Sequence, residues 1–359
     1  MSPTSSTTLG VAPLGPAAEA YRRAARRRAW LGGLVCLGLL ASVTADVLIG
    51  PAALSVPAVL AAILRPDTAD PAALTIVWTF RLPTALMAVL IGSALGVAGT
   101  LAQTILNNPL ASPYTLGVSA AAGFGAALAM VCGAGLLPFA GVLLVPLSAF
   151  FFATLSVAAI YAMARRQRGT SESLVLGGVA LLFLFNAGVA LLQYLASEDQ
   201  LQAIVFWLFG SLEGATWRKL AVLAATLLVV LPWLGAKSWQ LTALRLGDGR
   251  AQALGVEVKA LRLTMLLVLS VLTATSVCFA GSIGFIGLVA PHLGRMAVGE
   301  EHRFLLPVTA ALGALLLSGA SVASKLVVPE AAFPIGIATA FLGVPFFASM
   351  VLARKGNHW

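Results

Sequence analysis

The residue types with the most specific chemistry gather in one polar segment, Trp239–Arg262, which interrupts long apolar runs on both sides. Its sequence, WQLTALRLGDGRAQALGVEVKALR, holds six charged residues and three glycines: Arg245, Asp248, Arg250, Glu257, Lys259 and Arg262, with Gly247, Gly249 and Gly255. Charges of both signs among leucines suit a contact with another protein, and a plain solvated loop is the alternative. We therefore expect a folded docking surface at this segment.

Two short helices are predicted inside this segment. The first covers Leu241–Leu246. Asp248 is a suitable N-cap for the second, because its carboxylate accepts hydrogen bonds from first-turn amides. This second helix runs through Arg250 to Leu254 and stops at Gly255, since glycine tolerates the left-handed conformation that ends many helices.

Motifs of common ATP-using and metal-dependent enzymes are missing. The segment Gly235-Ala236-Lys237-Ser238 lacks the glycine that precedes the lysine of a phosphate-binding loop. The three histidines are scattered, and Glu300-Glu301-His302 is interpreted as a charged loop end. No paired carboxylates lie inside an apolar run, and Asp46 is predicted at the membrane interface. We expect no catalytic residue, no metal site and no cofactor bound by this chain.

Two further polar stretches lie near the ends of apolar runs. NNPLASPYTLG (residues 107–117) contains two prolines, which break a helix and favour extended geometry before them. A simple turn and an irregular constriction lining a pathway are equally compatible with it. In the second stretch, Gly169-Thr170-Ser171-Glu172, a hydroxyl group either caps the next helix or narrows the mouth of a pore.

The composition indicates a membrane protein. Of the 359 residues, 60% are hydrophobic and only 10% are charged, whereas soluble domains are about one quarter charged. The apolar runs are continuous rather than alternating, which favours spanning helices over a barrel. A short aromatic helix at the outer interface is predicted over residues 203–212, AIVFWLFGSL, which are too few to span.

Ten transmembrane helices are predicted. They cover residues 30–49, 74–106, 115–136, 140–164, 173–195, 218–236, 262–280, 283–298, 304–327 and 335–353. Residues 1–29 are expected to be a disordered cytoplasmic tail with an arginine cluster at its end. Residues 30–355 form one transmembrane domain, with the polar loop at 237–262.

The positions of the basic residues predict the orientation. With both termini in the cytoplasm, 17 of the 22 lysines and arginines fall on the inside, as the positive-inside rule requires. The run that opens at Arg81-Leu82-Pro83 then points inward and the run that opens at Arg262-Leu263 points outward. Each is followed by an irregular stretch with glycine or proline, which suggests an inverted repeat.

Together these stretches resemble the FecCD-type permeases of type II ABC importers, which carry iron–siderophores, haem or cobalamin. The resemblance covers about residues 30–355 and the same order of ten spans. It rests on Arg81-Leu82-Pro83, NNPLASPYTLGVSAAAGFGAALA (107–129), WLFGSL (207–212), LGDGRAQALGVEVKALRL (246–263), GFIGLVAPHLGRMAVGEEHRFLLP (284–307) and FPIGIATAFLGVPFF (333–347). It implies an all-α, polytopic, inverted-repeat fold.

The resemblance also implies roles for individual residues. The loop between spans six and seven of the family seats coupling helices on an ATPase, and its candidates here are Leu246, Gly247, Asp248, Arg250, Leu254, Gly255 and Val256. A cytoplasmic gate is implied at Asn108, Leu110, Thr170 and Ser171. Docking of a binding protein is implied at Arg81 and Lys325, although Thr84, Ser321 and Lys325 depart from the usual residues, and lysine lacks the fork of arginine.

The implied function is ATP-driven import of a metal chelate across the inner membrane. Expected partners are two cytoplasmic ATPase subunits, which use ATP and Mg²⁺, a second permease copy or paralogue, a periplasmic or lipid-anchored binding protein, and membrane lipid, but no nucleic acid. A secondary, ion-coupled carrier is the alternative, and it requires an intramembrane acid or histidine for which the sequence offers no good candidate. A membrane-embedded enzyme requires paired acids or a metal cluster, which the sequence also lacks.

Overall fold

The computed structural model describes residues 16–136, 141–166, 171–327 and 333–353, and these residues form helices and connecting loops without a strand. Ten helices correspond to the ten predicted spans: α1 (Pro16–Leu48), α4 (Leu82–Ile105), α5 (Val118–Leu136), α6 (Leu144–Arg166), α7 (Ser171–Leu195), α9 (Trp217–Ala236), α12 (Val258–Ala280), α13 (Ile286–Val298), α14 (His302–Val327) and α15 (Ile335–Ala353). The all-α prediction is confirmed.

Length and hydropathy divide these helices into two groups. Within the described ranges, 7 segments are long and apolar enough to cross a bilayer, and α5, α13 and α15 contribute shorter apolar stretches. The second span is composite: α3 (Pro71–Thr75) and a π-helical turn, η2 (Ile76–Arg81), lead directly into α4. Together they form an apolar segment of 35 residues, longer than the roughly 20 residues that a bilayer needs.

The remaining elements are short. They are α2 (Val56–Leu64), η1 (Pro66–Thr68), η3 (Gly141–Leu143), α8 (Glu198–Phe209), α10 (Ser238–Leu244) and α11 (Asp248–Ala253). Helix α8 begins earlier than the aromatic run that predicts it, because Ser197 and Gln200 form a capping box at its N-terminus. This box adds a polar first turn to the helix.

The N-terminal prediction needs correction. Residues 16–29 belong to α1, whereas the low complexity of this region favours an irregular tail. Alanines and arginines dominate residues 17–28, and both are strong helix formers, so the helix extends beyond the apolar stretch. Residues 1–15 lie outside the described part of the chain.

Helix α4 is the centre of the molecule. In its segment 83% of the apolar window is buried, against 11% for α1. Glycines let its backbone approach its neighbours closely: an added Cβ at Gly92 would collide with the carbonyl of Gly313 on α14, and one at Gly99 with the carbonyl of Gly287 on α13. Small residues at such crossings are the usual packing of membrane helices.

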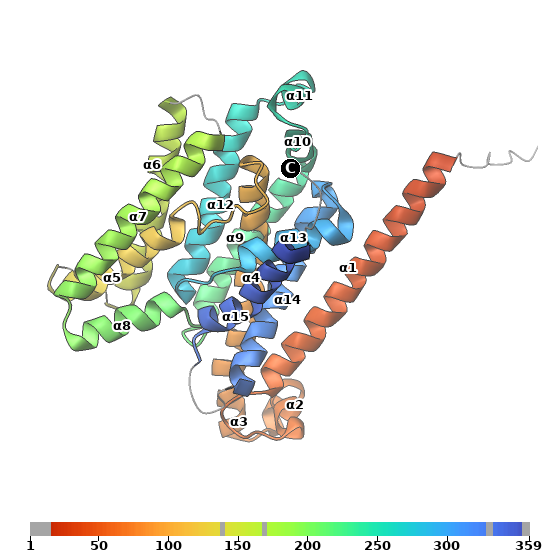
Figure 1. Cartoon of the computed structure of the whole chain (residues 1–359). Helices are drawn as coiled ribbons and strands as arrows, with labels where there is room; N and C mark the ends of the chain where they lie inside the picture. The colour runs from red at the N-terminus through yellow and green to blue at the C-terminus, as the bar shows by residue number, and fades with distance from the viewer. Residues whose placement is uncertain (1–15, 137–140, 167–170, 328–332, 354–359) are drawn as a thin grey trace, which may run out of the picture.

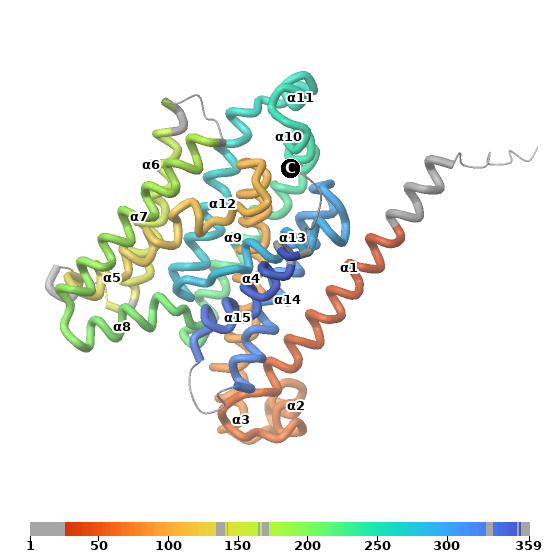
Figure 2. The backbone as a smooth tube through the Cα atoms, in the orientation of Figure 1, coloured from red at the N-terminus to blue at the C-terminus, as the bar shows by residue number. Residues whose placement is uncertain are grey.

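The two ends of the molecule differ in their elements. In Figure 1, α10 and α11 lie at one end, whereas α2 and α3 lie at the opposite end. The backbone trace in Figure 2 shows α4 and α14 in the middle, the α6–α7 pair on one flank and α1 leaning away on the other. The polar segment 237–262 is therefore at one end, and residues Arg81 and Lys325 belong to helix ends far from it.

Candidate coupling site

The 237–262 loop is folded as two short helices. Helix α10 ends at Leu244 and α11 follows after a turn at Gly247, whose φ of 96° is left-handed. Gly255, with φ 82°, ends the second helix as the sequence predicts. The first helix begins three residues and ends two residues earlier than predicted. Its end is set by the backbone amide of Arg245, which donates to the carbonyls of Thr242 and Ala243.

The surface of this loop presents both apolar and charged side chains. The side chains of Leu246 and Leu254 are 53% and 55% exposed, and Arg250 on α11 is exposed as well. Val256, by contrast, is only 4% exposed and packs in the main core cluster. The predicted set therefore divides into residues that face outward and a valine that anchors the loop.

The predicted role of Asp248 as an N-cap is wrong. Gly247 occupies the cap position, and Asp248 is the first residue of α11. Its two carboxylate oxygens accept hydrogen bonds from Arg262 at 2.9 and 3.1 Å. Arg262 is buried and also donates to the carbonyl of Ile105, at 2.8 Å, on the last turn of α4. The loop is thus bound to α4 through one arginine.

A second arginine makes a parallel connection. The guanidinium of Arg245 donates to both carboxylate oxygens of Glu300, at 2.8 and 3.2 Å. Its remaining terminal nitrogen donates to Oδ1 of Asn107 at 2.8 Å. Asn107 follows Leu106, the C-cap of α4, and has a left-handed φ of 45°. A planar guanidinium suits such a three-way contact, because its donors are held in a fixed fork.

His302 is buried and connects three helices, which its interpretation as part of a charged loop end does not predict. It begins α14, is 0% exposed, and its Nε2 lies 2.8 Å from Oγ1 of Thr104 on α4. Its Nδ1 lies 3.3 Å from Oγ1 of Thr242 on α10, and its backbone amide donates to the same oxygen at 3.0 Å. His302 stands directly before an apolar span, and this position is a sequence signal that favours its burial.

The predicted gate residues are partly described. Asn108 and Leu110 lie in the turn after α4, where the Asn108 side chain accepts a hydrogen bond from the Leu110 amide at 2.9 Å. Leu110 is 38% exposed. Ser171 begins α7, and Thr170 lies outside the described residues. The turn at 107–110 is next to the loop because Asn107 binds Arg245.

The predicted docking residues have partners within the chain. Arg81 is buried and donates to the carbonyls of Val47, Leu48 and Ala52 at 3.0, 2.8 and 2.6 Å, so it ties down the end of α1. The ammonium of Lys325 lies 2.8 Å from the carboxylate of Asp46. Asp46 is 0% exposed and lies two residues before the end of α1, so it is near the predicted end of its span but covered by protein.

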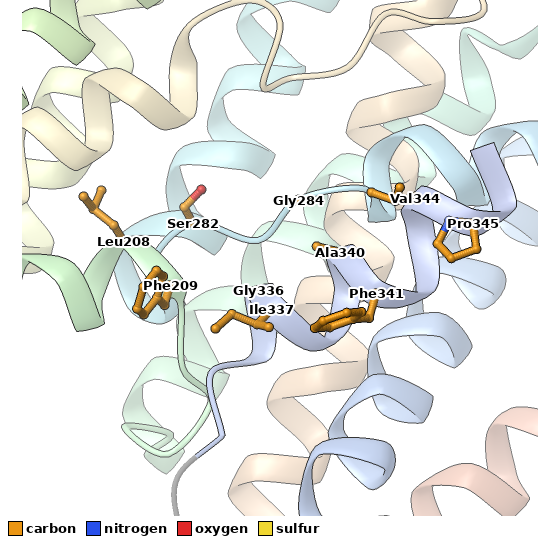
Figure 3. A pocket seen from close by; sticks show the side chains of 10 residues that line it. All are labelled: Leu208, Phe209, Ser282, Gly284, Gly336, Ile337, Ala340, Phe341, Val344 and Pro345. Carbon is orange, nitrogen blue, oxygen red and sulfur yellow. The ribbon is translucent and has the colours of Figure 1, made fainter. Parts of the chain in front are cut away.

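An apolar cavity of about 460 Å³ lies between α8, the loop after α12, and α15. Figure 3 shows Phe209 and Leu208 from α8 opposite Ile337 and Phe341 from α15. Ser282 supplies the only side-chain oxygen among its lining residues. Such a wall offers contact area without a charged binding group.

Among the described residues, no three His, Cys, Asp or Glu side chains form a metal-binding group. These residues form a helical membrane domain with a folded polar loop at one end. It matches a solved structure described as an inward-facing conformation of a metal-chelate type ABC transporter, with TM-score 0.79, 33% identity, and coverage of 90% of this chain and 98% of that one.

Sequence comparisons specify the class further. The family model of the FecCD transport family matches residues 38–354. The hemin transport system permease protein HmuU of Yersinia pestis is 38% identical over 78% of this chain and 84% of its own length. The vitamin B12 import system permease protein BtuC of Serratia proteamaculans is 38% identical over 79% of this chain and 84% of its own length. The chain belongs to the FecCD transport family and is a permease subunit of a type II ABC importer.

Proposed function

We propose that this chain is the path by which an iron–siderophore, haem or cobalamin-type chelate crosses the inner membrane. The observation that carries the proposal is the cavity between α8 and α15, whose lining is apolar apart from Ser282. A bulky chelate with an organic outer surface would pass such a wall without being held by charge. The relatives named for hemin and vitamin B12 transport support a cargo of this class.

The energy source in this proposal is ATP hydrolysed with Mg²⁺ in two separate ATPase subunits. The sequence has no phosphate-binding loop, so force must arrive through a contact. The outward-facing coupling residues are Leu246, Asp248, Arg250 and Leu254, while Gly247 and Gly255 set the turns and Val256 anchors the loop. This placement puts the loop and both chain termini in the cytoplasm, as the distribution of basic residues favours.

The gate and the docking surface complete the proposed cycle. Asn108 and Leu110 would narrow the inner mouth together with Thr170 and Ser171. At the opposite end, Lys325 keeps 17% of its side chain exposed beside Glu213 and a small depression, within reach of a binding protein. Arg81 stabilises that surface from inside the protein, because it donates hydrogen bonds to the end of α1. A second permease copy or paralogue would complete the pathway.

Uptake into vesicles tests the proposal. The permease is co-purified with its ATPase, reconstituted with ATP inside, and supplied with a binding protein loaded with labelled chelate outside. We expect accumulation that requires ATP and stops with an ATPase whose catalytic glutamate is replaced by glutamine. Uptake driven by a proton gradient without ATP would contradict the proposal and favour an ion-coupled carrier.

A further inference from the structure

The link between α13 and α14 contacts three separate parts of the molecule through three consecutive residues. Glu300 binds Arg245 of the coupling loop. Glu301 accepts a hydrogen bond from Arg28 of α1 at 2.8 Å. His302 reaches Thr104 on α4 and Thr242 on α10. We refer to Glu300, Glu301 and His302 as the 300–302 link.

The 300–302 link is attached to α10 through the hydroxyl group of Thr242. The hydroxyl of Thr242 donates to the carbonyl of Ser238 at 2.9 Å and accepts the amide hydrogen of His302 at 3.0 Å. The first residue of α14 is therefore fixed to the middle of α10. Because His302 is fully buried, water has no access to replace these hydrogen bonds if α10 moves alone.

The same link fixes α10 to the inner end of α4. The imidazole of His302 lies between Thr242 and Thr104, one on each side. Arg245 adds a second attachment, because it binds Asn107 and Glu300 with one guanidinium. Asn107 immediately precedes Asn108 in the turn proposed as a gate. Any displacement of α10 is thus passed to this turn through two side chains.

Arg295 is a second basic neighbour of the link. It lies on the last turn of α13, and its Nε is 3.9 Å from the carboxylate of Glu300. Its side chain is 10% exposed, and its two terminal nitrogens have no hydrogen-bond partner among the described residues. Glu300 therefore lies between two arginines, Arg245 of the coupling loop and Arg295 of α13, and its carboxylate joins the end of α13 to that loop.

We propose that the 300–302 link, with Thr242 and Arg245, is the transmission contact that makes the coupling loop and the gate turn after α4 move as one body. Thr242, Arg245 and His302 are positioning residues, since none of them touches the cargo. The inference rests on the proposed function, in which the coupling loop receives force from an ATPase. It extends that function by naming the route from the loop to the gate.

Vesicle assays test this route by measuring the amount of cargo imported per ATP hydrolysed. We expect Thr242→Val and Arg245→Gln to lower this ratio by between about twofold and thirtyfold, the range for residues along a coupling path. Arg245→Lys should retain part of the ratio, because its ammonium still pairs with Glu300 but lacks the fork that also reaches Asn107. Arg166→Gln, at an exposed position on the end of α6, is the control. An unchanged ratio in both Thr242→Val and Arg245→Gln would overturn the inference.

A distance measurement separates the inference from the proposed function. Spin labels are placed at Gln252 on α11 and Tyr114 after the gate turn, both exposed, in a chain whose three cysteines are replaced by serine. We expect one narrow distance distribution in the purified permease, and a broader one in Thr242→Val with Arg245→Gln. Superimposable distributions would overturn the inference even where transport is normal. If ATP drives no uptake in the wild type, the proposed function fails, and the distances still decide the inference.

Discussion

At the scale of single residues, the end of the molecule opposite the 237–262 loop is organised by a buried ion pair. Oδ1 of Asp46 accepts from Ser321 and lies 2.8 Å from the ammonium of Lys325, which also donates to the Asp46 carbonyl at 2.8 Å. Asp46 has no exposed surface and Lys325 has little. A charge removed from water in this way requires its partner. The pair therefore explains why Lys325 stands at this position irrespective of any docking role.

Replacing one partner of this ion pair should destabilise the protein more than replacing both. In Lys325→Met the carboxylate of Asp46 stays buried without its cation, and we expect a loss of about 3 kcal/mol. The double variant Asp46→Asn with Lys325→Met should recover most of that loss. Unfolding in detergent, followed by circular dichroism, measures both. Lys259→Met, at an exposed position, is the control, and a Lys325→Met variant as stable as the wild type would contradict the structural role.

At the scale of elements, α10 and α11 present a small patch in which leucines and charges alternate. Leu246 and Leu254 are more than half exposed, although they belong to a loop whose other apolar residues, such as Ala251 and Val256, are buried. Arginine is enriched at protein interfaces, and the exposed leucines beside it add apolar contact area. The internal bonds of Asp248 and Arg262 keep this patch rigid before any partner arrives.

Substitutions on the patch should weaken ATPase binding without affecting the opposite end. We expect Leu254→Asp with Arg250→Glu to reduce the co-purified ATPase at least about tenfold, because interface hot spots contribute about 2 kcal/mol. Asp248 is left unchanged, since its reversal would also break the pair with Arg262. Arg166→Glu serves as the control. Loss of binding-protein docking in the same variant would mean that the loop only supports folding.

At the scale of the whole molecule, the two ends are expected to bind different partners, the ATPase at one end and the binding protein at the other. The coupling loop lies at one end of the bundle, and α2 and α3 lie at the other. The central pair α4 and α14 connects the two: Gly92 and Gly313 cross closely, and Thr104 contacts His302 at the end near the loop. At the opposite end, α14 binds α1 through Ser321 and Asp46. A signal at the coupling loop therefore has a continuous packed route across the membrane.

Thiol labelling tests the orientation of this bundle. Arg250→Cys and Glu213→Cys are made separately in a chain without its native cysteines. In intact cells with a permeable outer membrane, we expect an impermeant maleimide to modify Cys at 213 and to spare Cys at 250. Disruption of the inner membrane should expose both. Labelling of the 250 position in intact cells would contradict a cytoplasmic coupling loop.

The sequence predicts the helices of this structure better than the contacts between them. All ten spans and both short helices of the loop follow from apolar runs and from glycines at their ends, which are local signals. The pairs that hold the ends together are not local: Asp46 and Lys325 are 279 positions apart, and Thr104 and His302 are 198 apart. A single sequence contains no sign of which residues meet over such separations. For this reason the burial of His302 and the pairing of Asp46 with Lys325 do not follow from the sequence.

The contacts of α1 have a consequence for how the chain is made. Helix α1 is translated well before α14, and Ser42 and Asp46 bind Ser318 and Ser321 on α14. The ribosome must add more than 270 residues before that partner helix exists. During this interval α1 lies in the bilayer with an unsatisfied acid, which its position near the end of the apolar run keeps close to the headgroups. Completion of the bundle is thus a late event, in which the last third of the chain captures the first helix.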